Sequence, residues 1–163
     1  SYTIHGLTNG AGTVSLEDNF GRTEFALPRE AIITFDVELS CYQYGGSGGT
    51  VGDTTYALYR AVGTTTSTVG RITHNSTVDT QGTTRTFGYT FDNTNNSMQV
   101  SFNVTGANNT LLLWSATVRV TSTAVDTALL PTAGGDSAGF NGDATTLEIE
   151  FNGQSSTFLE FNG

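Results

Sequence analysis

The chain has 163 residues, the length of a single domain, and nearly half of them are Thr (30), Gly (20), Ser (13) or Asn (12). Its six basic residues are all arginine, while 15 acidic residues bring the net charge to −9. Because non-specific nucleic-acid binding and polybasic membrane binding both need clustered cations, this balance excludes both classes, so we expect no nucleic-acid partner. The 36% of hydrophobic residues, with 10 Phe and 6 Tyr, are enough to build a core.

No segment approaches 18 consecutive apolar residues, so the sequence predicts no membrane-spanning helix and no membrane partner. Ser1 is compatible with the loss of an initiator Met or with a trimmed chain, and the first residues lack the pattern of a signal peptide. The single cysteine, Cys41, cannot form an internal disulfide. We therefore expect stability to come from burial and from assembly.

Alternation of apolar and polar residues, the period of a β-strand with one buried face, runs through the chain. In chain order it is clearest at residues 33–41, 85–91, 97–105, 112–121 and 146–151, with shorter candidates at 3–7, 13–17, 54–62, 68–74 and 156–161. The predicted shared core is Ile33, Phe35, Val37, Leu39, Phe87, Tyr89, Phe91, Val100, Phe102, Val104, Leu112, Trp114, Ala116 and Val118.

Turn residues separate these segments, and no window shows a sustained helical period. Asn93–Asn96 and Gly106–Asn109 are predicted to join consecutive strands, and Asn152-Gly153 is a strong hairpin signal because both residues tolerate positive φ. The fold class is therefore all-β, an antiparallel β-sandwich or jelly roll of about 8–10 strands. We expect a sandwich domain over residues 1–125. Residues 126–163 are expected to form a C-terminal loop and β-hairpin, packed on that domain or on a neighbouring subunit.

The sequence offers little for catalysis. His5 and His74 are the two histidines, and His74 precedes a polar run that we expect to be a loop. Asp36 with Glu38, and Glu148 with Glu150, are carboxylates two positions apart on one strand face, about 7 Å apart and within the range of an inverting glycosidase. Because both pairs lie opposite an apolar stripe, we interpret them as solvated surface charges. We predict no catalytic residue.

No metal or cofactor is predicted either. Asp136, Asn141 and Asp143 could offer oxygen ligands from one loop, but the EF-hand spacing is absent and a Gly-rich turn explains the same residues. No phosphate-binding loop or dinucleotide fingerprint is present. Cys41 is in phase with its apolar stripe, so we expect it to be a small buried hydrophobic residue.

The candidate interface residues are aromatic or out of phase. Tyr42 and Tyr44 follow a strand and precede the glycine run 45–49, where exposed tyrosines can stack on sugars, anchor a protein interface or simply cover a sheet. Leu113 lies opposite the Trp114 face, and Leu129-Leu130 stand in a polar stretch. The chain also has no lysine to guard free sheet edges, which favours subunit contact.

The segment from Val104 to Thr121 ends one strand in Thr-Gly, turns, and returns as a Trp-x-Ala-x-Val-x-Val-Thr strand. This segment resembles a hairpin of small tailed-phage virion proteins, and so do Leu27–Ile32 and the Thr54–Arg60 strand. The similarity covers about residues 27–125 and implies a β-sandwich displayed on a phage particle. Proteins of this type end soon after the Trp strand, whereas this chain continues for about forty residues beyond it.

The resemblance implies a virion structural protein on the particle surface, with capsid decoration and stabilisation as the first expectation. A tail fibre or spike receptor-binding knob is an alternative. A second alternative is a carbohydrate-binding or adhesin domain of a larger surface protein. A third alternative is a glycan-cleaving enzyme. We expect a homotrimer whose partners are other virion proteins, such as the capsid shell or the tail. Host-surface glycan is a further possible partner.

Overall fold

A computed structural model of the chain describes residues 1–94, 97–124, 146–151 and 154–160. The chain divides into two compact units, Ser1–Ala124 and Val125–Gly163. Every regular element of the described residues is a β-strand, and the paired strands are antiparallel. The described residues contain no helix long and apolar enough to cross a membrane. The fold is thus an all-β sandwich, as the alternation predicts.

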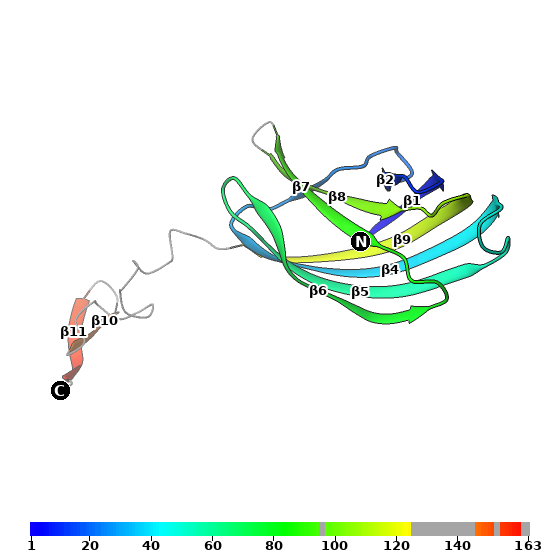
Figure 1. Cartoon of the computed structure of the whole chain (residues 1–163). Coiled ribbons are helices and arrows are strands. Elements are labelled where there is room, and N and C mark those ends of the chain that lie inside the picture. Colours follow the sequence, from blue (N-terminus) through cyan, green and yellow to red (C-terminus); the bar gives the residue numbers. More distant parts are fainter. Residues whose placement is uncertain (95–96, 125–145, 152–153, 161–163) are drawn as a thin grey trace. The chain divides into compact units, whose positions relative to one another are not determined.

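The larger sheet of the first unit has five strands in the order β1-β9-β4-β5-β6 (Figure 1). Its central strand β4 is long and pairs along most of its length with both neighbours, so its backbone groups are hydrogen-bonded on both sides. The strands are β1 (Tyr2–Asn9), β9 (Thr110–Ala124), β4 (Ala31–Gly46), β5 (Thr54–Thr65) and β6 (Gly70–Gln81).

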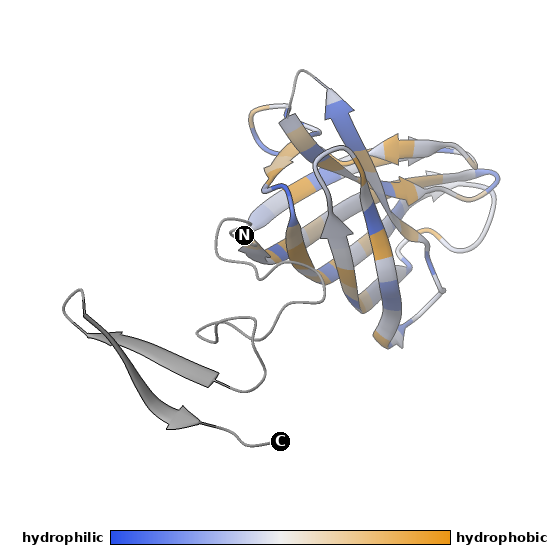
Figure 2. Cartoon of the chain, turned by 90° about the vertical axis from the view of Figure 1, so that its left-hand side faces the viewer, coloured by the Kyte–Doolittle hydropathy of each residue, from blue (hydrophilic) through white to orange (hydrophobic). Residues whose placement is uncertain are grey.

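The smaller sheet is built around β8 (Ser97–Thr105). β7 (Phe87–Thr94) pairs with β8 along its length, while β2 (Thr13–Ser15) and β3 (Phe25–Leu27) pair with its two ends. Hydrophobic and hydrophilic residues alternate along many strands of both sheets (Figure 2). Each sheet therefore has an apolar face, and the two apolar faces pack together.

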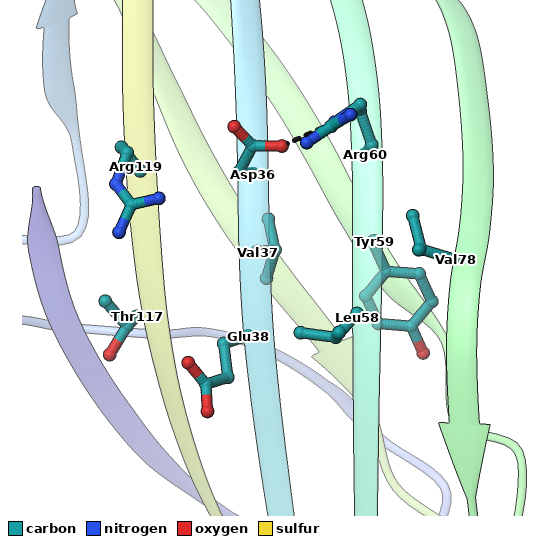
Figure 3. Close-up of a pocket in the computed structure, with 9 residues that line it drawn as sticks. All are labelled: Asp36, Val37, Glu38, Leu58, Tyr59, Arg60, Val78, Thr117 and Arg119. Atoms are coloured by element: carbon teal, nitrogen blue, oxygen red, sulfur yellow. Dashed lines mark hydrogen bonds and ion pairs between the residues drawn. The ribbon is translucent and has the colours of Figure 1, made fainter.

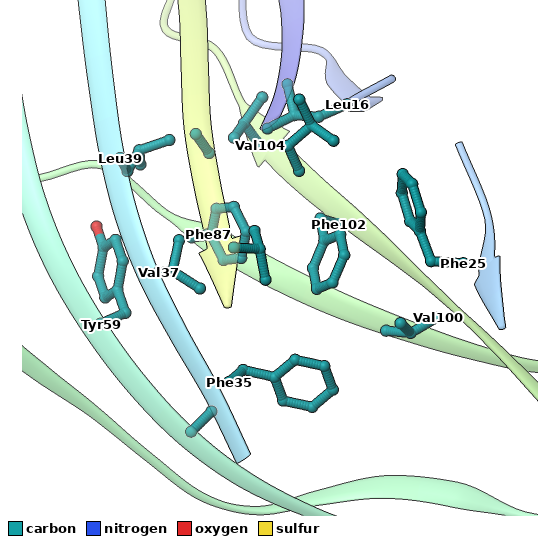
Figure 4. Close-up of a cluster of buried hydrophobic side chains, with 14 of the residues drawn as sticks. Leu16, Phe25, Phe35, Val37, Leu39, Tyr59, Phe87, Val100, Phe102 and Val104 are labelled. Atoms are coloured by element: carbon teal, nitrogen blue, oxygen red, sulfur yellow. The ribbon is translucent and has the colours of Figure 1, made fainter. Parts of the chain in front are cut away.

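The core between the sheets is rich in phenylalanine (Figure 4). Phe35 of β4 is fully buried, and its ring centroid lies 5.1 Å from that of Tyr89 and 5.9 Å from that of Phe102 on the smaller sheet. The predicted core is confirmed, except that Tyr89 and Phe91 are partly buried and pack against it. Cys41 is 3% exposed, so its predicted burial is also confirmed.

The β1 edge of the larger sheet is joined to the smaller sheet by the main chain. His5 and Glu17 exchange two backbone hydrogen bonds, at 2.8 and 2.9 Å, and the Leu16 N–H donates to the Phe102 carbonyl of β8. Leu16 is itself fully buried. The chain thereby closes this side of the sandwich.

Two sequence predictions are wrong in detail. Gly106–Asn109 does not turn a hairpin, because β8 and β9 belong to different sheets, and this connection crosses from one sheet to the other. The polar run after His74 is not a loop: His74 lies inside β6, which continues to Gln81. β6 shows no alternation because most of it is exposed on both faces.

The second unit contains the strands β10 (Thr146–Phe151) and β11 (Gln154–Glu160), which pair antiparallel as a two-stranded sheet. The register shifts between Leu147 and Glu148. The predicted turn Asn152-Gly153 and the candidates Leu129, Leu130, Asp136, Asn141 and Asp143 lie outside the described residues.

Candidate interaction surface

The face of the larger sheet that points away from the core is here called the outer face. On β4 the odd-numbered residues from Ala31 to Gln43 are buried, so the even-numbered residues point outward. The register carries this face across the sheet, because each outward residue of β4 lies opposite an outward residue of β9 and of β5. The outer face is therefore a broad surface whose inner strands, β9, β4 and β5, each have a strand partner on both sides.

Four large exposed side chains gather at one end of the outer face. Leu7 of β1 is paired with Leu113 of β9, and Leu113 is paired with Tyr42 of β4, so the three form one row across three strands. Tyr44 comes two residues after Tyr42 on β4, where the register with β9 shifts, and it is exposed as well. Their exposed fractions are 59% for Leu7, 43% for Leu113 and 41% for each tyrosine. We call this set, Leu7, Tyr42, Tyr44 and Leu113, the Leu–Tyr patch.

The structure thus brings together three of the predicted interface residues, Tyr42, Tyr44 and Leu113. Sequence reasoning missed Leu7, although it is out of phase with the buried Ile4 of its own strand, the same signal that identified Leu113. Nothing in the sequence shows that β1 pairs with β9, because that contact joins residues more than a hundred positions apart.

The loop that follows the patch is ordered by hydrogen bonds. The buried side-chain amide of Gln43 donates to the carbonyls of Gly45 and Gly48, and the Gly48 N–H donates to the Asn109 carbonyl. Gly46 has φ 93°, and a Cβ there would lie 2.2 Å from the Asn109 carbonyl oxygen, so only glycine fits. Tyr42 and Tyr44 therefore stand on a fixed scaffold.

A hollow of about 330 Å³ lies beside the patch. Ser40 of β4 lines it together with its two cross-strand neighbours, Ser115 of β9 and Tyr56 of β5. Tyr42 and Leu113 also line it. Desolvation raises the pKa of the Tyr56 hydroxyl, and the neighbouring Glu38 carboxylate raises it further. Tyr56 is therefore neutral near pH 7, and the hollow offers aromatic rings and hydroxyls without a charge of its own.

Charged residues occupy the middle of the outer face (Figure 3). Asp36 of β4 lies between Arg119 of β9 and Arg60 of β5, and the Arg60 Nε donates to the Asp36 carboxylate at 2.6 Å. With Glu38, these residues line a shallow hollow of about 220 Å³. Asp36 and Glu38 thus lie on the outward face as predicted, and Asp36 is held in an ion pair.

The histidines do not form a site together. His5 lies on β1 and His74 on β6, the two opposite edges of the same sheet. The His5 Nε2 is 3.9 Å from a Glu17 carboxylate oxygen, and both side chains are about half exposed. Among the described residues, no group of three or more His, Cys, Asp or Glu side chains could hold a metal ion. Burial raises the pKa of the Cys41 thiol, so the thiol stays protonated near neutral pH.

Comparison with known proteins finds no matching family model, no matching curated protein and no matching solved structure. The resemblance to phage virion proteins and the roles that it implies stay predictions. The functional argument therefore depends on the outer face itself.

Proposed function

We propose that this chain is a non-enzymatic structural protein of a phage virion, displayed on the particle surface, where it decorates and stabilises the capsid. The Leu–Tyr patch is its contact with neighbouring subunits. The observation that carries the proposal is the row of Leu7, Leu113 and Tyr42 across three paired strands, with Tyr44 beside it. Single exposed apolar residues are ordinary on soluble proteins, whereas a contiguous group on a rigid sheet marks a contact surface.

The chemistry of the patch suits a protein contact. Tyrosine is enriched at interfaces because it buries a large ring and still offers a hydroxyl to the rim. The patch is also supported from below, since the inward residues of the same strands, among them Cys41, Leu112 and Trp114, are at most 3% exposed. Contact there would lose little conformational freedom of the main chain.

The proposal is tested by the mass of the purified full chain in sedimentation experiments over a range of concentrations. We expect an oligomer, with the homotrimer as the specific expectation, that Leu113→Ser disperses. Ile32→Ser is the matched control, because Ile32 lies on the same outer face with 54% exposure but far from the patch. A monomer at every concentration, or equal dispersal by both substitutions, would overturn assembly through the patch.

Display on a virion has its own test. Antibodies raised against the purified chain should label the outside of intact phage particles from a culture that carries the gene. Electron microscopy of the labelled particles then separates capsid from tail. Particles without label would contradict the virion role and leave assembly through the patch as a separate finding.

The hollow beside the patch favours a second function, a carbohydrate-binding or adhesin domain, which includes a receptor-binding knob. Its tyrosines and serine hydroxyls are the groups that stack on and hydrogen-bond a neutral sugar ring. Titration of the full chain with a panel of neutral oligosaccharides tests this function. Saturable binding that Tyr56→Ala abolishes and Ile32→Ser leaves unchanged would establish it. No binding to any member would exclude neutral glycan as the ligand.

A further inference from the structure

β6 forms the other edge of the larger sheet, and β5 is its sole strand partner among the described residues (Figure 1). It is 12 residues long, and residues 73–79 are exposed on both faces. Every second residue of such an edge directs its N–H and C=O away from the sheet, where another strand can pair with them. β6 is thus open to addition of a strand.

The residues of β6 are arranged symmetrically about Asn75. Arg71 and Asp79 lie four positions to either side of it, and His74 and Ser76 lie one position to either side. If two β6 strands pair antiparallel with the two Asn75 residues opposite each other, each Arg71 faces the Asp79 of the other strand. A contact of this kind is isologous, because the same residues serve on both sides of a two-fold axis.

The register with β5 places these residues on one face. Arg71 and His74 pair with Thr64 and Val62, while Ser76 and Asp79 pair with Arg60 and Leu58, and these four residues of β5 belong to the outer face. The register shifts on either side of the centre, between Leu58 and Tyr59 and between Val62 and Gly63. Without these two bulges, simple alternation would put His74 and Ser76 on the face opposite to Arg71 and Asp79.

Neither charge has an ion-pair partner among the described residues. Eight residues of strand separate Arg71 from Asp79, about 27 Å, which is too far for an ion pair. Asp79 accepts a hydrogen bond from the Gln81 side chain at 3.2 Å, and no described ion pair involves Arg71 or Asp79. Bulges and charges usually protect an edge from pairing, but opposite charges at symmetric positions repel unlike strands and accept a second copy.

We propose that β6 pairs with β6 of a second copy of this chain, antiparallel about Asn75, with Arg71 of each copy against Asp79 of the other. The two sheets then join into one sheet of ten strands. The main chain around the two-fold axis, His74–Ser76, lies between the bulges and supplies the regular hydrogen bonds, and the charge pairs fix the register. This edge lies across the sheet from β1 and is independent of the Leu–Tyr patch.

Charge exchange tests the proposal. Sedimentation of the full chain in low salt is compared for wild type, Arg71→Asp, Asp79→Arg and the double exchange, all in the Leu113→Ser background so that contact through the patch does not contribute. Each single substitution puts like charges together twice in the dimer and should weaken dimerisation about tenfold or more. The double exchange restores opposite charges and should return the dissociation constant to within about threefold of wild type.

Arg119→Asp is the control for a changed net charge, because Arg119 lies on the outer face but on β9, away from this edge. It should leave dimerisation unchanged, and thermal melting of each variant checks that it folds. A chain that stays monomeric in the Leu113→Ser background, or single substitutions without effect, would overturn pairing through β6. If the single substitutions weaken dimerisation and the double exchange does not restore it, the register about Asn75 is wrong. Each variant is compared with the Leu113→Ser chain itself, so a change in association on charge exchange reports on β6 separately from the patch.

Discussion

The two edge strands of the larger sheet differ in how the chain treats them. On β1, Ile4 and Thr8 are buried, and the backbone of Glu17 binds that of His5 and so covers part of the free edge. On β6, residues 73–79 are exposed on both faces, and β5 is the one strand that pairs with it in the described part of the chain. The comparison teaches that one edge of a sheet can be covered by its own chain while the other stays open. A further strand could then add to this sheet only beside β6.

Removing the side chain that anchors β1 should have the largest effect. Trp114 is fully buried on β9, and its indole N–H donates to the Thr8 hydroxyl of β1 at 2.9 Å. Trp114→Ala should lower the free energy of unfolding by about 3–5 kcal/mol. Val78→Ala on β6 should change it by less than about 0.5 kcal/mol, because Val78 is 61% exposed. Chemical denaturation measures both, and equal effects would show that the two edges do not differ.

The sequence predicts the half-buried strands of the sandwich, but it does not predict the full length of the exposed edge strand β6. Alternation identified β4, β8 and β9 because each has one covered and one open face, so period two records burial directly. β6 has two open faces over most of its length and therefore no period to detect, which is why the sequence predicts a loop after His74.

The candidate surface shows the same limit. Tyr42, Tyr44 and Leu113 could be identified one by one from phase and from the glycine run after them. Their assembly into one row with Leu7 depends on which strands are neighbours, and strand order comes from contacts between distant residues. The crossing of Gly106–Asn109 from one sheet to the other was missed for the same reason, since a hairpin turn and an inter-sheet connection use the same turn residues.

Two buried threonine hydroxyls sharpen the comparison. The Thr8 hydroxyl on β1 accepts the Trp114 bond, whereas the buried Thr80 hydroxyl on β6 has no hydrogen-bond partner in the described structure. Thr8→Val keeps the shape but leaves the indole N–H unsatisfied, and should cost about 1–3 kcal/mol. Thr80→Val removes an unsatisfied group and should be neutral or stabilising. Thermal or urea unfolding measures the free energy of unfolding of both variants. If Thr80→Val destabilises the protein as much as Thr8→Val does, the two hydroxyls do not differ as proposed.

The smallest effect should come from the contact between the His5 and Glu17 side chains beside the closed edge, which is an ion pair only with a protonated histidine. His5 and Glu17 carry side chains that are 46% and 49% exposed and 3.9 Å apart, so water and salt screen their attraction. The two backbone bonds between the same residues do not depend on the carboxylate. Glu17→Gln should therefore change the free energy of unfolding by no more than about 0.5 kcal/mol, and the change should disappear at high salt. A larger loss that persists in salt would mean that the side chains, rather than the main chain, hold β1 closed. In that case the difference between the two edges would depend on replaceable surface charges instead of on the path of the chain.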